Sequence, residues 1–102
     1  MDCIERVRTA LELREPDRVP VGEWGIDHDT AEQVLGRDTY WRNRTREKLG
    51  LWDGKRDEVI DSQKHDVVEL VRKLGHDLIP VMMVPSADFE PPEIEQTGPE
   101  SW

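Results

Sequence analysis

A short amphipathic helix followed at once by a strand candidate is the feature that most limits how this chain can fold. A capping box is predicted where Asp2 precedes Glu5, and Pro16 predicts the helix end because proline disfavours helical angles in the residue before it. Residues 19–24 are typical of a short strand with Pro20 at its start or edge. The helix has one apolar face, formed by Ile4, Val7, Ala10 and Leu11.

Three further helices are expected along the chain. Thr30 and Gln33 form a second capping-box pattern, and Gly36 is a plausible end for that helix. A weaker helical pattern covers residues 38–50, and the longest covers residues 55–74. Gly75 should end this longest helix, which carries an apolar stripe of Val59, Ile60, Val67, Val68, Leu70, Val71 and Leu74.

Residues 77–84 form a nearly continuous apolar run of strand length, which suits a strand covered on both faces. Pro80 in this run counts against a fully paired central strand. Residues 85–102 are acidic and proline-rich and are predicted to be a loop or tail. The resulting fold class is α/β: helix, strand, helices, long helix and strand, forming a right-handed βαβ crossover within residues 1–84.

Composition limits the possible partners and the size of the core. The chain has 102 residues, 14 basic and 23 acidic, for a net charge of −9 that argues against nucleic-acid and anionic-membrane binding. Hydrophobic residues make up only 35%, which is thin cover for a self-sufficient fold. A single cysteine, Cys3, favours a reducing, cytoplasmic location, and no apolar run approaches the ~18 residues of a membrane span.

The order of these elements resembles the start of a known superfamily. Glu5-Arg6-Val7, Ala10-Leu11 and Pro16-Asp17-Arg18-Val19-Pro20-Val21 resemble the entry of uroporphyrinogen decarboxylases and of methyltransferases that serve corrinoid proteins and thiols. The long helix, the apolar run and the Phe89-Glu90-Pro91-Pro92-Glu93-Ile94 stretch follow the same order.

The resemblance implies an incomplete TIM barrel, because a full (β/α)8 barrel needs roughly 250 residues. It implies a small-molecule substrate at the barrel mouth, and in the full-length family zinc held by late His and Cys residues and a corrinoid partner. None of the catalytic residues, metal ligands or cofactors is expected within this chain, which would be an N-terminal fragment without catalysis of its own. Residues 98–102 resemble the interior of a loop rather than the end of a finished element, as expected for a truncated reading frame.

Two departures disfavour the decarboxylase branch. Decarboxylases of the family grip substrate carboxylates with an arginine-rich loop after the first strand, whereas residues 22–29 here contain no arginine and three acids. The family aspartate at the end of the second strand, in a Phe-Ser-Asp context, is also missing. Met82-Met83-Val84 stands in its place, with Asp88 four residues later.

The candidate substrate-contacting residues follow the first predicted strand, where barrel enzymes place functional groups. They are Glu23, Trp24, Asp27 and His28. The run Asp27-His28-Asp29 could bind a divalent metal or tune the histidine as an acid–base group. Adjacent side chains seldom converge on one point, so helix capping and solvation are the favoured interpretation of this run.

Other polar groups have simpler interpretations. His65 and Glu69, four residues apart, could share a metal but fit a solvated helix face, and His76 fits a helix end. The alternating Arg42, Arg44, Arg46 and Lys48 would line an anion site only on an extended segment, because a helix scatters that spacing. Met82 and Met83 suggest core filling.

A second hypothesis belongs to a different class. Two strands with an open edge are poorly stable as a monomer. The chain could therefore be a small acidic oligomerising or partner-binding module without enzymatic activity. Because of this open edge, the isolated chain is expected to self-associate.

Overall fold

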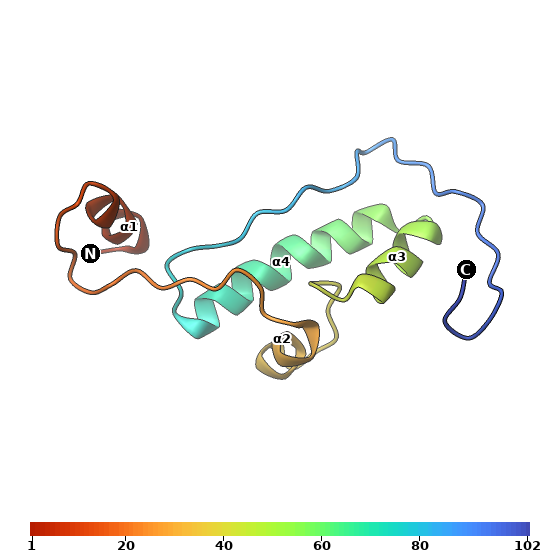
Figure 1. The fold of residues 1–102 in the computed structure, drawn as a ribbon, viewed down its shortest axis with the longest axis horizontal. Helices are drawn as coiled ribbons and strands as arrows, with labels where there is room; N and C mark the ends of the chain where they lie inside the picture. The colour runs from red at the N-terminus through yellow and green to blue at the C-terminus, as the bar shows by residue number, and fades with distance from the viewer.

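The computed structural model describes residues 1–102 and contains four helices and no strand (Figure 1). The longest helix forms the axis of the molecule, and two shorter helices pack against it, whereas the N-terminal helix packs against none of the other three. The helices are α1 (Cys3–Leu11), α2 (His28–Leu35), α3 (Arg44–Trp52) and α4 (Arg56–Leu74).

The core lies where α2 crosses α4. Trp41, in the connection between α2 and α3, completes this cluster and is almost fully buried. The predicted apolar stripe of α4 is confirmed at its centre, although Val68 and Leu74 at its edges are exposed. The cluster consists of Ala31, Leu35, Trp41, Val67 and Leu70.

Gly50 allows α3 to approach α4 closely. It is buried, and a Cβ atom built on it would lie 2.8 Å from Cγ2 of Val59 and 3.0 Å from Cε1 of Tyr40. Val59 and Ile60 are buried near this crossing. A side chain at Gly50 would therefore separate the two helices.

Several predicted helix ends are confirmed. The Asp2–Glu5 capping box is present at α1, with the Glu5 amide donating to Oδ1 of Asp2 at 2.8 Å. Gly36 and Gly75 end α2 and α4 in the left-handed conformation, with φ of 73° and 67°. A residue with a Cβ would be strained at either position.

Two helix starts were predicted wrongly. α2 begins at His28 with Asp27 as its N-cap, so Thr30 does not cap it. The helix expected over residues 38–50 begins only at Arg44, because the Asn43 side chain caps it by accepting from the Arg46 amide at 3.2 Å. Residues 38–43 are instead a connection that carries Thr39 and Trp41 into the core.

The predicted α/β class is wrong, and no portion of a barrel sheet forms. Residues 19–24 and 78–84 contain no strand, and the one backbone hydrogen bond between residues 19–24 and 77–84 runs from the Asp77 amide to the Val21 carbonyl at 2.7 Å. Oδ2 of Asp77 accepts the Val21 amide at 3.0 Å, which removes the next backbone donor from a ladder. Pro20 and Pro80 have no backbone donor. The one isolated bridge joins Gly98 and Ser101.

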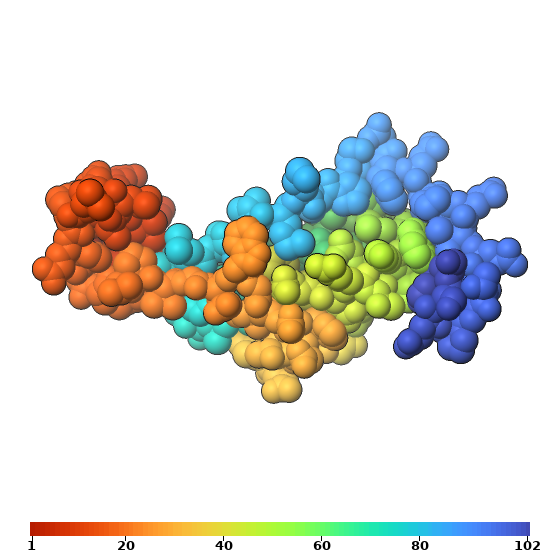
Figure 2. Space-filling model, in the orientation of Figure 1, coloured from red at the N-terminus to blue at the C-terminus, as the bar shows by residue number.

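The apolar face of α1 is not buried. Ile4 and Leu11 are 68% and 78% exposed, while the buried residues of this helix are Arg6 and Thr9. Figure 2 shows α1 as a separate lobe, joined to the body by a narrow neck. The lobe is therefore held by polar contacts and leaves an apolar face open to solvent.

The molecule is elongated. Its extents are 55 × 30 × 19 Å and its radius of gyration is 17.2 Å, against about 13 Å for a compact domain of ~100 residues. Residues 85–102 contain no helix and run past α3 to the end of the molecule opposite α1 (Figure 1). Much of the chain consequently lies outside the core.

Candidate functional site

The predicted substrate-contacting loop is open to solvent. Glu23 is exposed, Trp24 is 84% exposed, and Asp27 is the exposed N-cap of α2. His28 is the half-buried first residue of α2. The structure does not bring these four side chains together; it pairs only Asp27, which accepts from Nη2 of Arg42 at 3.2 Å.

Arg42 supplies this loop with the guanidinium that its own sequence lacks. Its side chain crosses Gly25, where an added Cβ would lie 2.6 Å from Cζ of Arg42. Its Nε is buried and has no hydrogen-bond partner. Arg42 also has a φ of 54°, an unusual value for a residue with a side chain. Sequence reasoning treated Arg42 as a member of a helical series; Gly25 was the available signal of a close approach.

A group of paired charges, here called the Asp77 cluster, is formed by Arg6, Asp17, Arg18 and Asp77. The Asp77 side chain is fully buried. Its carboxylate accepts from Nη1 of Arg6 at 2.6 Å and from Nη1 of Arg18 at 2.7 Å. The Val21 amide and then these guanidinium groups hold the pKa of Asp77 well below its ordinary value, against the opposing effect of burial.

Asp17 completes the cluster. Its carboxylate accepts from Nε and Nη2 of Arg6 at 2.7 and 2.9 Å, and this pairing lowers its pKa from 3.8 to about 2. The cluster joins α1 and residues 17–21 to Asp77, three residues beyond the end of α4. Because every carboxylate in it is paired, the arrangement anchors α1 and leaves no free acid or base for catalysis.

A second group, the Asp66 cluster, fixes the connection after α2 to α4. Thr39 Oγ1 donates to Oδ2 of Asp66 at 2.6 Å and accepts from the Trp41 amide at 3.0 Å. Nη2 of Arg37 donates to Oδ1 of Asp66 at 2.6 Å and to Oε2 of Glu69 at 2.7 Å. The polar groups of this cluster pair with one another, so we assign the cluster a structural role.

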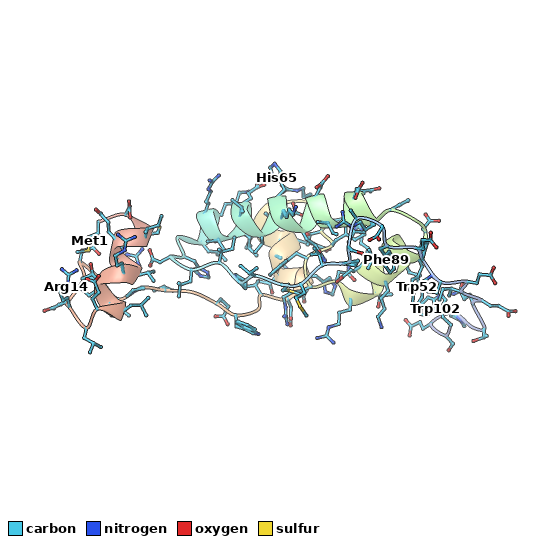
Figure 3. The ribbon with its side chains drawn as sticks, turned by 90° about the horizontal axis from the view of Figure 1, so that it is seen from above. Met1, Arg14, Trp52, His65, Phe89 and Trp102 are labelled. Atoms are coloured by element: carbon cyan, nitrogen blue, oxygen red, sulfur yellow. The ribbon has the colours of Figure 1, made fainter.

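The histidines do not form a metal site. His65 projects from the outer face of α4 (Figure 3), and Glu69 is engaged by Arg37 and Lys73. No group of three or more His, Cys, Asp and Glu side chains could hold a metal ion.

One exposed apolar feature is a continuous stretch, here called the apolar segment, residues 78–84. Met82 and Met83 were predicted to fill the core, and this prediction is wrong. Their side chains are 50% and 99% exposed. Val81 is 85% exposed. The segment has an extended backbone without strand partners, so it presents both apolar side chains and unpaired peptide groups. The other exposed residues are Leu78, Ile79 and Val84.

No family model matches the chain, and neither a curated protein nor a solved structure matches it. The resemblance to the uroporphyrinogen decarboxylase superfamily therefore stays a prediction from the sequence. None of the four helices is long and apolar enough to span a membrane.

Proposed function

We propose that this chain is a non-catalytic N-terminal portion of a uroporphyrinogen decarboxylase-like enzyme, of the methyltransferase-like or divergent branch. Its apolar segment is the surface on which the remaining polypeptide packs. The proposal rests on one observation: six large apolar side chains of residues 78–84 are exposed on a backbone that has no strand partner.

Two further features support the proposal that this chain packs against additional polypeptide. The apolar face of α1 is open to solvent, so burial of Ile4 and Leu11 requires atoms from elsewhere. The core around α4 is small for a chain of 102 residues, and a domain of this size normally buries well over half of the surface of its unfolded chain. Contiguous exposed apolar patches mark interaction sites.

Co-expression tests the proposal. The chain is produced with the polypeptide encoded immediately downstream, and hydrogen exchange is measured on the pair and on the chain alone. We expect the amides of Ile79, Val81 and Met83 to be protected in the pair and unprotected in the chain alone. Unchanged exchange at these amides in the pair would contradict the proposal.

The alternative function is an oligomerising module, and the same segment favours it. An extended, apolar, unpaired edge is a template for pairing with a second copy. The net charge of −9 opposes close approach of two copies. Sedimentation equilibrium distinguishes the alternatives: a defined dimer near twice 11.9 kDa supports the module, whereas a monomer that pairs only with the downstream polypeptide supports the enzyme portion.

A further inference from the structure

The exposed side of α3 carries a concentration of positive charge in an otherwise acidic chain. A hollow beside α3, here called the α3 hollow, is lined by Arg42, Arg44, Glu47, Lys48 and Met82. Three of its five side chains are cationic and one is anionic, although the whole chain carries 23 acids against 14 bases. This surface therefore offers positive charge to a ligand, although the chain as a whole is acidic.

Arg44 and Lys48 are the unpaired cations of this hollow. They lie four residues apart on α3, so they share one face of the helix. Within the basic series, Arg42 pairs with Asp27 and Arg46 pairs with Asp38, but no ion pair engages Arg44 or Lys48. Arg46 also lies over the Tyr40 ring, 5.0 Å from its centroid, and belongs to the opposite hollow.

Arg44 is also the first residue of α3, so the positive end of the helix dipole adds to the same region. The sequence prediction held that a helix would scatter the basic series. Arg44 and Lys48, which are four residues apart in this series, nevertheless lie on the same face of α3.

Apolar surface flanks these two cations on both sides. Met82 of the apolar segment closes one side of the α3 hollow. On the other side, a neighbouring hollow is lined by Arg44, Lys48, Leu49, Trp52 and Trp102 together with Thr45. The rings of Trp52 and Trp102 meet edge to face with centroids 5.8 Å apart, and Figure 3 shows both at the end of the molecule opposite α1.

We propose that the face of α3 around Arg44 and Lys48 binds a small organic anion with an aromatic or alkyl body. The two cations hold the anionic group through charge-assisted hydrogen bonds. The body of the ligand lies against Trp52 and Trp102, which line the same hollow as the two cations. The site does not depend on the proposed membership in an enzyme family, since every group in it belongs to this chain.

Two fluorescent probes of similar shape test the site. Anilinonaphthalene sulfonate carries the required anion on an aromatic body, and phenylnaphthylamine is its neutral counterpart. Each is titrated into the full chain, its own fluorescence and the quenching of tryptophan emission being recorded. We expect the sulfonate to bind more tightly than the neutral probe and to weaken as sodium chloride is raised, because salt screens exposed charges.

Paired variants locate the binding. The double variant Arg44→Gln, Lys48→Gln should weaken sulfonate binding by about tenfold, because two charge-assisted contacts are lost, and should leave phenylnaphthylamine binding unchanged. The control Lys64→Gln, Arg72→Gln makes the same charge change on exposed positions of α4 and should change sulfonate binding less than twofold. Circular dichroism verifies that both proteins keep their helices. Should the first double variant unfold, Lys48→Gln alone replaces it.

Three results would overturn the inference: no sulfonate binding, equal binding of the charged and neutral probes, or an equal loss in both double variants. The second result would assign the surface to general apolar binding. The third would assign the effect to net charge.

Discussion

Asp77 and Val21 bind each other in both directions: the Asp77 amide donates to the Val21 carbonyl at 2.7 Å, and Oδ2 of Asp77 accepts the Val21 amide at 3.0 Å. The same carboxylate receives the guanidinium groups of Arg6 and Arg18. One aspartate thus attaches the N-terminal lobe to the end of α4.

We predict that Asp77→Asn releases α1. The substitution leaves Arg6, whose side chain is 9% exposed, without this buried counter-charge. α1 has nine residues, and isolated helices shorter than ~12 residues are marginal in water, so the helix should fray once detached. Hydrogen exchange of the α1 amides and of Val21 should accelerate, while the amides of α4 keep their protection. Asp61→Asn, at an exposed position of α4, is the control and should change neither.

Stability should fall with acid because of Glu69. Arg37 and Lys73 lower the pKa of Glu69 from 4.5 to about 2. A carboxylate with a depressed folded-state pKa stabilises the fold fully above its unfolded pKa, and this contribution is lost as the pH falls towards the folded value. Urea unfolding followed by circular dichroism should show midpoints that decline between pH ~5 and ~2. Glu69→Gln should lower the midpoint at neutral pH and flatten this decline; an unchanged slope would contradict the assignment.

Thr39→Val should destabilise the core despite its similar shape. Thr39 is 1% exposed, and its hydroxyl both donates to Asp66 and accepts from the Trp41 amide. The loss of two hydrogen bonds, with a buried amide left unpaired, should cost about 1–3 kcal/mol. Urea titration monitored by tryptophan fluorescence measures the loss. Thr45→Val, on the exposed face of α3, should stay within about 0.5 kcal/mol.

Gly50→Ala should destabilise the chain even though alanine favours a helix by about 1 kcal/mol. The new Cβ would lie 2.8 Å from Cγ2 of Val59, and a β-branched side chain has few rotamers with which to move away. Overpacking typically costs 1–3 kcal/mol, which offsets the gain or exceeds it. The thermal midpoint should fall, whereas Thr45→Ala, with a smaller helical gain and no clash, should raise it slightly. A higher midpoint for Gly50→Ala would show that α3 does not pack as described.

Local signals predicted the helices better than the sheet. Gly36 and Gly75 were correct helix ends because glycine adopts positive φ at no steric cost. The strand pattern of residues 78–84 was misleading, because a strand also needs a neighbouring strand. The carboxylate of Asp77 accepts from the Val21 amide, which would otherwise begin the pairing. Apolar periodicity in α1 likewise predicted burial, but charged contacts decided which face was covered.

The candidate site shows the same limit of sequence reasoning. Asp27 was predicted to contact substrate, which stays a prediction, and its partner in the structure, Arg42, is 15 residues away in the chain. No periodicity connects Asp27 with Arg42; only the glycine at position 25 hints at the guanidinium that crosses it. Long-range pairings of this kind depend on how the connection after α2 turns, which composition and spacing do not specify.

The elongated shape affects how the size of this protein is judged. A particle of 55 × 30 × 19 Å has a larger hydrodynamic radius than a sphere of the same mass. A single copy should therefore leave a gel-filtration column early, at a volume that a globular standard calibration assigns to a heavier species. Light scattering on the eluting peak separates the two cases, because it reports mass independently of shape.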